Sequence, residues 1–430
     1  MTRSSVPGAL LGLWVAIGLV VPSAAQAFAA PLVRVPFVGR AWTTGASIWV
    51  GTADSFGDAA GETLTLRARE ETACETCWVV TVLMTDAGTG GGFRSWKGSL
   101  EGLKPNTRYH YGIFASGFTG ERGGFYFRTE PDGGARFKVG VASCMNGANA
   151  PSQPSWDIMH EQLNTGEPNI QLLVGDNMYT TESPPSKNHY WFKYFQQRAV
   201  PQFTNVFRAF PTFAIWDDHD YGPNDEDATF AQKDVAREAY AALYPHPPFA
   251  GDGIYHSFNW GRVEFFMMDD RWGRDCPRSM PAGYSPKMYG TTQFSWLKSS
   301  LQASTATFKV IVNGSTLGNT CWGAQKQALF DFIANNKIGG VLFVTGDIHR
   351  SLITDRTPTG GYPLYELISS GIGSPSTPAE YSFGVMEFNT TLADPTVTIK
   401  VIQNPQQRSS ISGVGVTVTT KTLKRSQLQN

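Results

Sequence analysis

Five short apolar runs in this chain end directly on residues that can bind metal or transfer protons. The runs span residues 137–142, 170–174, 212–216, 263–268 and 341–345. Unbroken apolar runs are typical of strands buried on both faces, and ligands bind beyond the carboxyl ends of such strands. The ends are spread over about 200 residues, too far for a local metal knuckle. The pattern therefore predicts a layered α/β core that assembles one shared site.

Length and composition favour a large globular enzyme body with a smaller companion domain. The chain has 430 residues, of which 41% are hydrophobic and 17% are charged, and that balance supports a large buried core. The formal net charge is -1, which excludes a general attraction for nucleic acid or anionic membranes. We expect no stable nucleic-acid partner, and any grip on an anion must be local.

The first 27 residues have the pattern of an export signal. Arg3 is the only early charge, residues 10–21 are apolar, and Ala25-Gln26-Ala27 is a small-x-small cleavage site. The apolar stretch is short for a bilayer span, and the alternatives are a membrane anchor or a buried helix. We expect a secreted, periplasmic or cell-surface protein with no transmembrane segment in its mature chain.

The chain has five cysteines, and export makes disulfides possible. Cys74 and Cys77 could close a small loop, and Cys276 and Cys321 are a plausible long-range pair. Cys144 then remains at a strand end. Metal ligation would protect its thiolate, and a buried inert thiol or a different pairing are the alternatives. The Cys-x-x-Cys spacing could also be a zinc or redox motif, but no second Cys or His pair completes a zinc site.

Residues 31–131 are expected to form a separate β domain. Strand composition recurs at 33–38, 47–50, 63–69, 78–84 and 108–114, with Gly and Asp between the runs. Leu-x-Pro-x-Thr-x-Tyr at 103–109 is a common corner of immunoglobulin-like and fibronectin-type folds, so we predict a β-sandwich. Pro-Asp-Gly-Gly at 131–134 has the composition of a linker.

From residue 135 to 425, strand runs alternate with helix-like stretches, which is typical of a layered α/β body. Trp156, Met159 and Leu163 share one helical face. Further helices are predicted at 190–198, 228–243, 293–301 and 324–335. Strands at 365–369, 396–402 and 413–422 suit a second sheet.

The Gly-Asp-Asn-Met-Tyr segment at 175–179 offers a bridging carboxylate. Asp176 at a tight turn can bridge two hard cations through its two oxygens. Tyr179 can reach the same ion if the loop curls back, although it could also be an ordinary surface or core tyrosine. Phenolate and thiolate ligands together favour a highly charged or softer metal over magnesium alone.

Three carboxylates surround one imidazole at Asp217, Asp218, His219 and Asp220. Such a cluster is costly unless cations neutralise it, and the alternative is a solvated acidic turn. Asn224 follows closely and could either add an oxygen ligand or be a turn residue.

Asp347 and His349 stand at alternate positions after the fifth run, so both side chains can face one ion; the alternative is an unrelated turn. Arg271 follows two aspartates at the fourth run and could grip a phosphate through its planar fork, or form a structural ion pair. The other histidines lack such surroundings and are expected at the surface or in the core: His110, His160, His189, His246 and His256.

With these motifs in place, the chain resembles the PhoD-like alkaline phosphatase family of metallophosphatases. The resemblance rests on Ser-Cys at 143–144, the segment at 175–179, Trp-Asp-Asp-His-Asp at 216–220, Asp-Arg at 270–271 and Gly-Asp-Ile-His at 346–349. It implies a calcineurin-like core of two stacked mixed β-sheets flanked by helices, after an immunoglobulin- or fibronectin-like sandwich. It also implies hydrolysis of phosphate monoesters and diesters with iron and calcium.

Carried over by motif, Cys144, Asp176 and Tyr179 would hold Fe3+, and Asp176 would bridge to Ca2+. Asp347 and His349 would complete the metal shell.

Asp218 and His219 stand where the wider superfamily has an Asn-His pair. The family's motif is Asp-Asp-His-Glu, but this chain has Asp220 in place of the glutamate. Because the aspartate side chain is shorter, we expect a contact behind the metal ligands or the position of a calcium ion to differ. The N-terminus also lacks the Arg-Arg pair of the family's usual export route.

The sequence therefore predicts an exported phosphohydrolase in which a metal-activated hydroxide attacks a small phosphate ester. His219 is the candidate for protonating the leaving group or steering the phosphate, and Arg271 for assisting substrate binding. The runner-up is a phosphodiesterase of the phospholipase D type, acting on phospholipid or nucleotide diesters. A hypothesis of another class is a cell-surface binding protein whose metals only rigidify loops, against which the thiolate and phenolate ligands argue.

Overall fold

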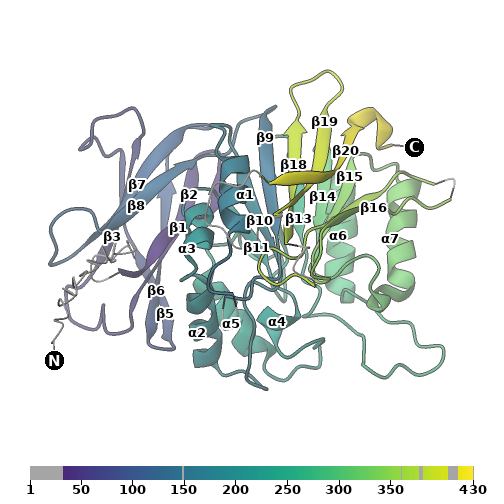
Figure 1. Ribbon diagram of the computed structural model, residues 1–430, viewed down its shortest axis with the longest axis horizontal. Coiled ribbons are helices and arrows are strands. Elements are labelled where there is room, and N and C mark those ends of the chain that lie inside the picture. The colour runs from purple at the N-terminus through teal and green to yellow at the C-terminus, as the bar shows by residue number, and fades with distance from the viewer. Residues whose placement is uncertain (1–31, 148–149, 360, 377–380, 405–414, 430) are drawn as a thin grey trace, which may run out of the picture.

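The computed structural model describes residues 32–147, 150–359, 361–376, 381–404 and 415–429. The predicted export signal at 1–27 lies outside the described residues. Two four-stranded sheets come first in the chain, and two six-stranded sheets with helices follow (Figure 1).

The N-terminal part consists of antiparallel strands in two sheets, ordered β1-β2-β6-β5 and β4-β3-β7-β8. Their bounds are β1 (Leu32–Trp42), β2 (Gly45–Ala53), β3 (Leu64–Glu70), β4 (Val80–Leu83), β5 (Thr85–Gly90), β6 (Phe93–Glu101), β7 (Arg108–Ala115) and β8 (Gly123–Arg128). The two sheets face each other. Gly98 of β6 lies against Leu66 of β3, so that a Cβ added to this glycine would be 2.9 Å from the leucine side chain. At the predicted corner, the Tyr109 hydroxyl accepts a hydrogen bond from the Lys104 N–H at 2.9 Å.

The rest of the chain forms two mixed sheets, ordered β11-β10-β9-β18-β19-β20 and β12-β13-β14-β15-β17-β16. Strands β9, β10 and β11 run parallel to one another, as do β13, β14, β15 and β17. The bounds are β9 (Arg136–Ala142), β10 (Ile170–Val174), β11 (Thr212–Ile215), β12 (His256–Trp260), β13 (Val263–Met267), β14 (Phe308–Val312), β15 (Val341–Thr345), β16 (Leu352–Asp355), β17 (Tyr365–Ile368), β18 (Ser382–Asn389), β19 (Thr396–Gln403) and β20 (Val416–Lys424).

Seven α-helices accompany these sheets in the described residues: α1 (Ser155–Leu163), α2 (Lys187–Gln197), α3 (Pro201–Phe207), α4 (Asp218–Tyr221), α5 (Lys233–Leu243), α6 (Thr291–Ala303) and α7 (Gly323–Asn335). Helix α1 covers the first sheet through Met159 and Leu163, which lie against Gly140 of β9. Phe330 of α7 packs on Phe343 of β15, so α7 covers the second sheet.

The two mixed sheets are stacked, as the family resemblance implied. Phe213 of β11 and Phe258 of β12 stack with ring centroids 3.5 Å apart. Phe388 of β18 packs against Phe308 of β14 at 5.5 Å. Aromatic pairs of this kind join the inner faces of both sheets, so their shared core fixes how the two sets of strand ends meet.

Two predicted helices start at different residues. The prediction of 228–243 is wrong at its start, because the Asp227 carboxylate accepts hydrogen bonds from the Thr229 N–H (2.9 Å) and hydroxyl (2.7 Å), which stabilise a turn before α5. Helix α2 begins earlier than residue 190, because Ser186 caps it by accepting from the His189 N–H.

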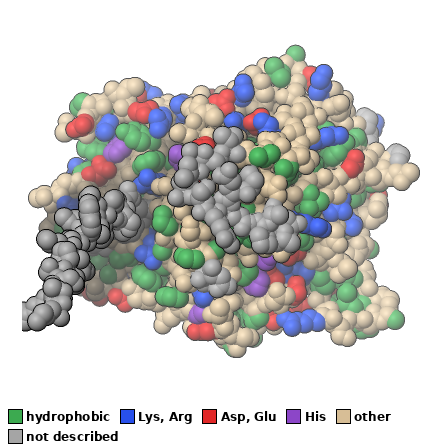
Figure 2. Space-filling model, viewed as in Figure 1, with side chains coloured by type: hydrophobic (Ala, Val, Ile, Leu, Met, Phe, Trp, Pro, Cys, Tyr) green, Lys and Arg blue, Asp and Glu red, His purple; other side chains and the backbone are tan. Residues whose placement is uncertain are grey.

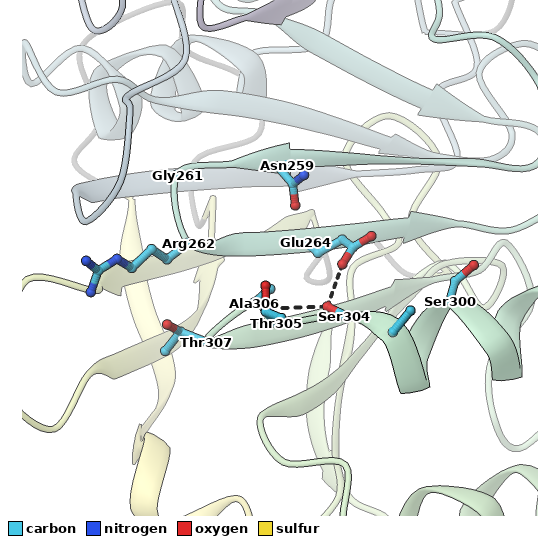
Figure 3. Close-up of a pocket in the computed structure, with 10 residues that line it drawn as sticks. Asn259, Gly261, Arg262, Glu264, Ser300, Ser304, Thr305, Ala306 and Thr307 are labelled. Atoms are coloured by element: carbon cyan, nitrogen blue, oxygen red, sulfur yellow. Dashed lines mark hydrogen bonds between the residues drawn. The ribbon is translucent and has the colours of Figure 1, made fainter.

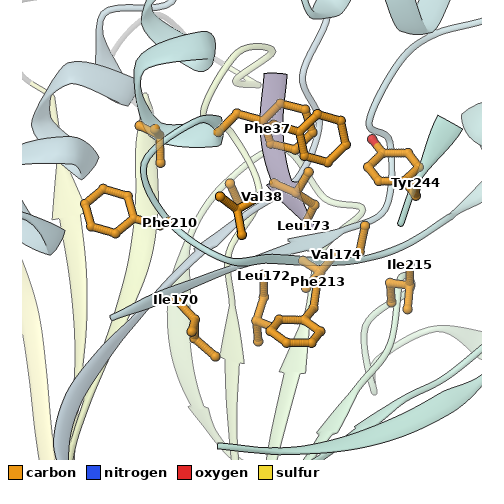
Figure 4. Close-up of a cluster of buried hydrophobic side chains, with 14 of the residues drawn as sticks. Phe37, Val38, Ile170, Leu172, Leu173, Val174, Phe210, Phe213, Ile215 and Tyr244 are labelled. Atoms are coloured by element: carbon orange, nitrogen blue, oxygen red, sulfur yellow. The ribbon is translucent and has the colours of Figure 1, made fainter. Parts of the chain in front are cut away.

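The N-terminal sheets share a core with the rest of the chain. Phe37 of β1 stacks on Phe207 of α3 with centroids 3.7 Å apart. In Figure 4, Phe37 and Val38 lie beside Leu173 of β10 and close to Tyr244. The two parts are therefore packed as one buried apolar cluster.

The cysteines pair as the sequence predicted, in Cys74–Cys77 and Cys276–Cys321 disulfides, and the Cys144 thiol is free and buried. None of the helices in the described part of the chain combines the length and apolar character needed to cross a bilayer. On the face in Figure 2, basic and acidic side chains are interspersed, in keeping with the near-zero net charge.

Candidate metal centre

The carboxyl ends of the parallel strands bring the predicted ligands together. Cys144 follows β9, Asp176 follows β10 and Asp347 follows β15. A Cβ on Gly346 would lie 2.5 Å from the Ser143 Oγ, so the end of β15 in one sheet touches the end of β9 in the other. The convergence predicted from the apolar runs is therefore present.

Two groups of ligand atoms share one carboxylate. Cys144, Asp176 and His349 offer atoms that all lie within 4.8 Å of one another, and so do Asp176, Asp218 and His219. Asp176 is the member common to both groups. A carboxylate in that position can bridge two cations through its two oxygens.

The contacts around Asp176 bring in the phenol. The Tyr179 hydroxyl donates to Asp176 Oδ2 at 3.1 Å and lies 3.2 Å from His349 Nε2. The Cys144 Sγ lies 3.4 Å from the same Oδ2. The Asp176 Oδ1 is buried and has no hydrogen-bond partner among the described residues. An orphaned buried oxygen in such company is the arrangement that a cation would satisfy.

Electrostatics also fit a cation at this place. Burial raises the pKa of Asp176 well above its ordinary range, and the Cys144, Asp218 and Asp347 groups raise it further. Burial raises the pKa of the Cys144 thiol to about 11. Burial therefore favours the protonated forms of both groups, and a positive ion between them would favour the deprotonated forms.

The ligand residues adopt a backbone conformation that side chains rarely tolerate. Cys144, Asp176, Asp347 and His349 have φ of 59°, 51°, 76° and 58°. Each such residue costs on the order of 1–3 kcal/mol, which the surrounding fold must offset. Backbone strain at several neighbouring residues is typical of a functional site. The sequence has no local pattern that predicts this strain.

Asp217 lies behind the ligands in a buried ion pair with Arg271. The Arg271 Nε donates to Asp217 Oδ1 at 2.6 Å and its Nη2 donates to the Ser315 hydroxyl at 3.1 Å. Gly175 and Gly314 leave room for the Asp217 side chain. A Cβ added to Gly175 would lie 2.5 Å from that side chain, and one added to Gly314 would lie 2.6 Å from it. Of the two interpretations of Arg271, this geometry favours the structural ion pair, because the guanidinium is 1% exposed and its fork is occupied.

Arg271 also acts on the ligands through its charge. Burial opposes that charge, but the Asp217, Asp218 and Asp270 carboxylates raise the pKa of Arg271 well above its ordinary value. In return, against the effect of burial, Arg271 helps to lower the pKa of Asp218 to about 2. Asp218 is thus ready to act as an anionic ligand.

The remaining predicted residues occupy varied positions. Asp347 belongs to neither ligand group, and burial together with the Asp218 charge raises its pKa to about 6. The half-buried His219 ring lies beside Tyr179 with centroids 4.2 Å apart. Asn224 lies in an exposed turn, where its amide donates to Asp225 at 2.6 Å. The turn interpretation of Asn224 is thereby favoured.

Sequence analysis missed the end of β14. Strand β14, which is apolar at 310–312, ends before Asn313, whose Nδ2 donates to Asp270 Oδ2 at 3.2 Å. The Ser315 N–H donates to the same oxygen at 2.7 Å. The sequence contains a signal for this strand end. Apolar residues followed by Asn-Gly-Ser resemble the other strand ends, which are followed by residues that can bind metal or transfer protons.

A separate hollow of about 590 Å³ lies at the opposite edge of the second sheet. Its lining includes Arg262 and Thr307, which directly precede β13 and β14, while the metal-binding candidates follow the strands. In Figure 3, Glu264 accepts a hydrogen bond from Ser304 at its wall. This hollow is not part of the candidate metal centre.

The comparison with protein families agrees with the resemblance. The family model described as PhoD-like phosphatase matches residues 139–427, more than half of the chain. This chain belongs to the PhoD-like phosphatases.

Relatives of this PhoD-like phosphatase were also found among curated and solved proteins. The chain is 24% identical to alkaline phosphatase D of Bacillus subtilis (strain 168) over 228 residues, which cover 41% of the chain and 39% of that relative. The solved structure of PhoD matches with a TM-score of 0.76 and 16% identity, over 93% of this chain and 91% of the other. A purple acid phosphatase, PPD1 from yellow lupin (Lupinus luteus) seeds, matches with a TM-score of 0.63 and 13% identity, over 91% and 75%. These structural likenesses establish a shared fold.

Proposed function

We propose that this PhoD-like phosphatase is an exported, metal-dependent hydrolase of small phosphate esters. The observation that carries the proposal is the pair of ligand groups that share Asp176. Buried carboxylates, a thiol and imidazoles within 4.8 Å form a donor set for two adjacent cations. Purely structural calcium would not call for sulfur or phenol ligands.

The ligand types suggest which ions the centre takes. Cys144, Asp176 and Tyr179, with His349 beside them, would hold Fe3+, because thiolate and phenolate suit a softer or more highly charged ion. Asp176 and Asp218 would hold Ca2+ through carboxylate oxygens, and Asp347 lies close enough to contribute charge. Such ions lower the pKa of water and supply a nucleophile near neutral pH while offsetting charge on the phosphoryl oxygens.

The protein's own residues would then orient the ester. His219 is half-buried beside Tyr179, and we propose that it contacts the phosphate or the leaving oxygen. Arg271 would act indirectly, by holding Asp217 and keeping Asp218 anionic. Replacing His219 with Gln should lower kcat, whereas loss of metal ligands should remove activity altogether.

Two chromogenic substrates test the activity and its class. The purified protein should release nitrophenol from nitrophenyl phosphate, from bis-nitrophenyl phosphate or from both, and a chelator should abolish that release. The ratio of the two kcat/KM values separates a monoesterase from a phosphodiesterase. Absence of turnover with both substrates, in protein shown to contain metal, would refute the proposal.

Iron has an optical signature. Ferric ion bound by the Tyr179 phenolate and the Cys144 thiolate should give a visible absorption band. Tyr179→Phe should shift or remove the band while the protein stays folded. A colourless, iron-free and fully active protein would refute the iron assignment and leave hydrolysis with other metals.

We also propose where the domain boundaries lie and that the protein is exported from the cytoplasm. Residues 1–27 would be a cleaved signal, 31–131 an immunoglobulin- or fibronectin-like sandwich, and 135–425 the catalytic domain. The Tyr109 corner supports the sandwich, and the two disulfides support an oxidising compartment. Mass spectrometry of the mature N-terminus should find cleavage after Ala27, and an intact N-terminus in exported protein would contradict it.

A further inference from the structure

The first N-terminal sheet is packed tightly onto helix α2. Phe195 of α2 stacks on Phe93 of β6 with centroids 4.1 Å apart and meets Trp49 of β2 edge-on at 5.5 Å. The Arg34 Nε of β1 donates to the Phe195 carbonyl at 2.8 Å. Figure 1 shows α2 beside β5, with α5 between α2 and α4. Helix α2 also touches the short α4 helix of the metal centre, because the Tyr190 hydroxyl donates to the Tyr221 carbonyl at 2.6 Å.

Arg198, at the end of α2, fixes this packing. It is fully buried, and its Nη2 donates to the Leu243 carbonyl at 2.9 Å. Its guanidinium lies 4.2 Å from the Trp49 ring centroid and 4.9 Å from that of Tyr244. The rings come from both parts of the molecule, so part of the stabilisation of the buried cation depends on the N-terminal sheet.

One helical turn before Arg198, Tyr194 contacts the metal centre from behind. Its hydroxyl donates to Asp220 Oδ1 at 3.0 Å. Asp220 also accepts from the Asn177 N–H, 3.1 Å from each oxygen, and from the Asp217 N–H at 3.2 Å. Asn177 directly follows Asp176, and Asp217 directly precedes Asp218.

Asp220 thus joins the two turns that carry the shared carboxylate and its neighbour. The Asp220 side chain is buried, and it accepts from two side chains, the Tyr194 hydroxyl and the Asn177 amide at 3.3 Å. A carboxylate held by several donors keeps a defined orientation, and groups behind metal ligands commonly set the ligands' geometry.

We propose that Tyr194 and Asp220 are positioning residues, through which the N-terminal sheets hold the Asp176 and Asp218 turns in register. The N-terminal sheets are then a working part of the metal centre. This inference rests on the proposed function for its effect on catalysis, but its structural effect can be measured without it.

The test compares Tyr194→Phe with Tyr111→Phe. Both tyrosines are buried to 1% exposure or less. The Tyr111 hydroxyl also lies between the two parts of the molecule, donating to the Arg208 carbonyl at 3.1 Å, but has no contact with Asp220 in the described residues. The readouts are hydrogen exchange of the peptide spanning 175–179 in metal-free protein, and kcat and KM of the loaded protein.

In Tyr194→Phe, we expect exchange at 175–179 to rise about tenfold and kcat to fall at least about tenfold, with KM within about twofold. Tyr111→Phe should leave both readouts within about twofold of the wild type. Asp220→Asn should raise exchange at 175–179 further, while strands β13 and β14 exchange as in the wild type.

Unchanged exchange and kcat in Tyr194→Phe would overturn the inference, and so would equal changes in Tyr111→Phe. If the wild type lacks phosphatase activity, the proposed function fails, and the exchange comparison still decides the positioning role. If the wild type is active and Tyr194→Phe matches it in both readouts, the inference alone fails.

Discussion

Asp176 is the residue common to both candidate metal-binding groups, at the scale of single residues. Both groups contain it, its Oδ1 lacks a hydrogen-bond partner in the part of the chain that the structure describes, and burial raises its pKa well above the ordinary range. Its neighbours Cys144 and Tyr179 approach its other oxygen. A change of this one side chain should therefore affect both metal positions.

The first prediction concerns loss of ligands. Asp176→Asn and Cys144→Ala should each lower phosphatase activity by more than about 100-fold, since even residues behind metal ligands cost 10–100-fold. Metal content should fall, and circular dichroism should show a folded protein. Asn224→Ala, in the exposed turn nearby, is the control and should keep activity within about twofold. Normal activity in either ligand variant would contradict the assignment.

A second prediction concerns the buried ion pair. Arg271→Met should lower the free energy of unfolding by about 3–5 kcal/mol, because it leaves Asp217 buried and unpaired. Urea denaturation of metal-free protein measures this. Arg278→Met removes an exposed arginine, 3.8 Å from Glu226, and should cost less than about 1 kcal/mol. Equal effects in the two variants would contradict the role given to Arg271.

The candidate site residues could be identified from the sequence, but the role of some of these residues could not. Cys144, Asp176 and Asp218 follow or flank apolar runs, so their candidacy followed from chemistry and position. The two interpretations of Arg271 differ only in the group that its guanidinium contacts. In the structure that group is Asp217, which is far from Arg271 in the sequence. The left-handed backbone at the ligands also depends on the folded surroundings rather than on local residue preference.

At the scale of elements, the two disulfides should differ in their contribution to stability. The Cys276–Cys321 bond joins residues 45 apart, and Cys74–Cys77 joins residues three apart. Loop-closure entropy predicts about 4 kcal/mol for the long loop and about 2 kcal/mol for the short one. Paired Cys→Ser variants, unfolded in urea, measure both values. A short-loop cost equal to or above the long-loop cost would contradict this ordering.

Elements with strong local signals could be predicted, and weakly patterned ones could not. Trp156, Met159 and Leu163 at helical spacing correctly indicated α1, whose buried face they form. Strand β5 is Thr-Asp-Ala-Gly-Thr-Gly, which carries almost no apolar pattern, and it forms because β6 pairs with it. The start of α5 depends on the Asp227 side chain, a choice that helix periodicity does not reveal.

At the scale of the whole molecule, acid should destabilise the fold through buried histidine. His256 is 1% exposed at the start of β12, and burial lowers its pKa from 6.5 to about 4. Its neutral form is favoured in the folded state, so the stability it contributes is full above about pH 6.5 and is lost as pH falls toward 4. Each unit of pKa difference corresponds to about 1.4 kcal/mol.

Thermal unfolding from pH 7.5 to pH 4.5 checks this prediction. His256→Phe should be less stable at neutral pH but should lose less stability on acidification than the wild type. His189→Phe, at a more exposed position with its own carboxylate partner Glu182, is the control. A wild-type slope in His256→Phe would show that another group controls acid stability.

The overall plan could be predicted from sequence because parallel strands of one sheet bring their carboxyl ends to one edge. Five runs that end on metal-binding or proton-transferring residues therefore predicted one shared site, and the family resemblance implied the two-sheet core. The shared core of the two parts could not be predicted, because Phe37 and Trp49 meet Phe195 and Phe207 only once both parts have folded. Contacts between distant segments leave no local pattern.

The most direct test of the metal centre is an anomalous-scattering map from crystals of the protein purified from its native compartment. We predict peaks within bonding distance of the Cys144 Sγ and the Asp176 carboxylate, with Asp176 contacting two peaks. A map without a peak between these side chains, in active protein, would contradict the account.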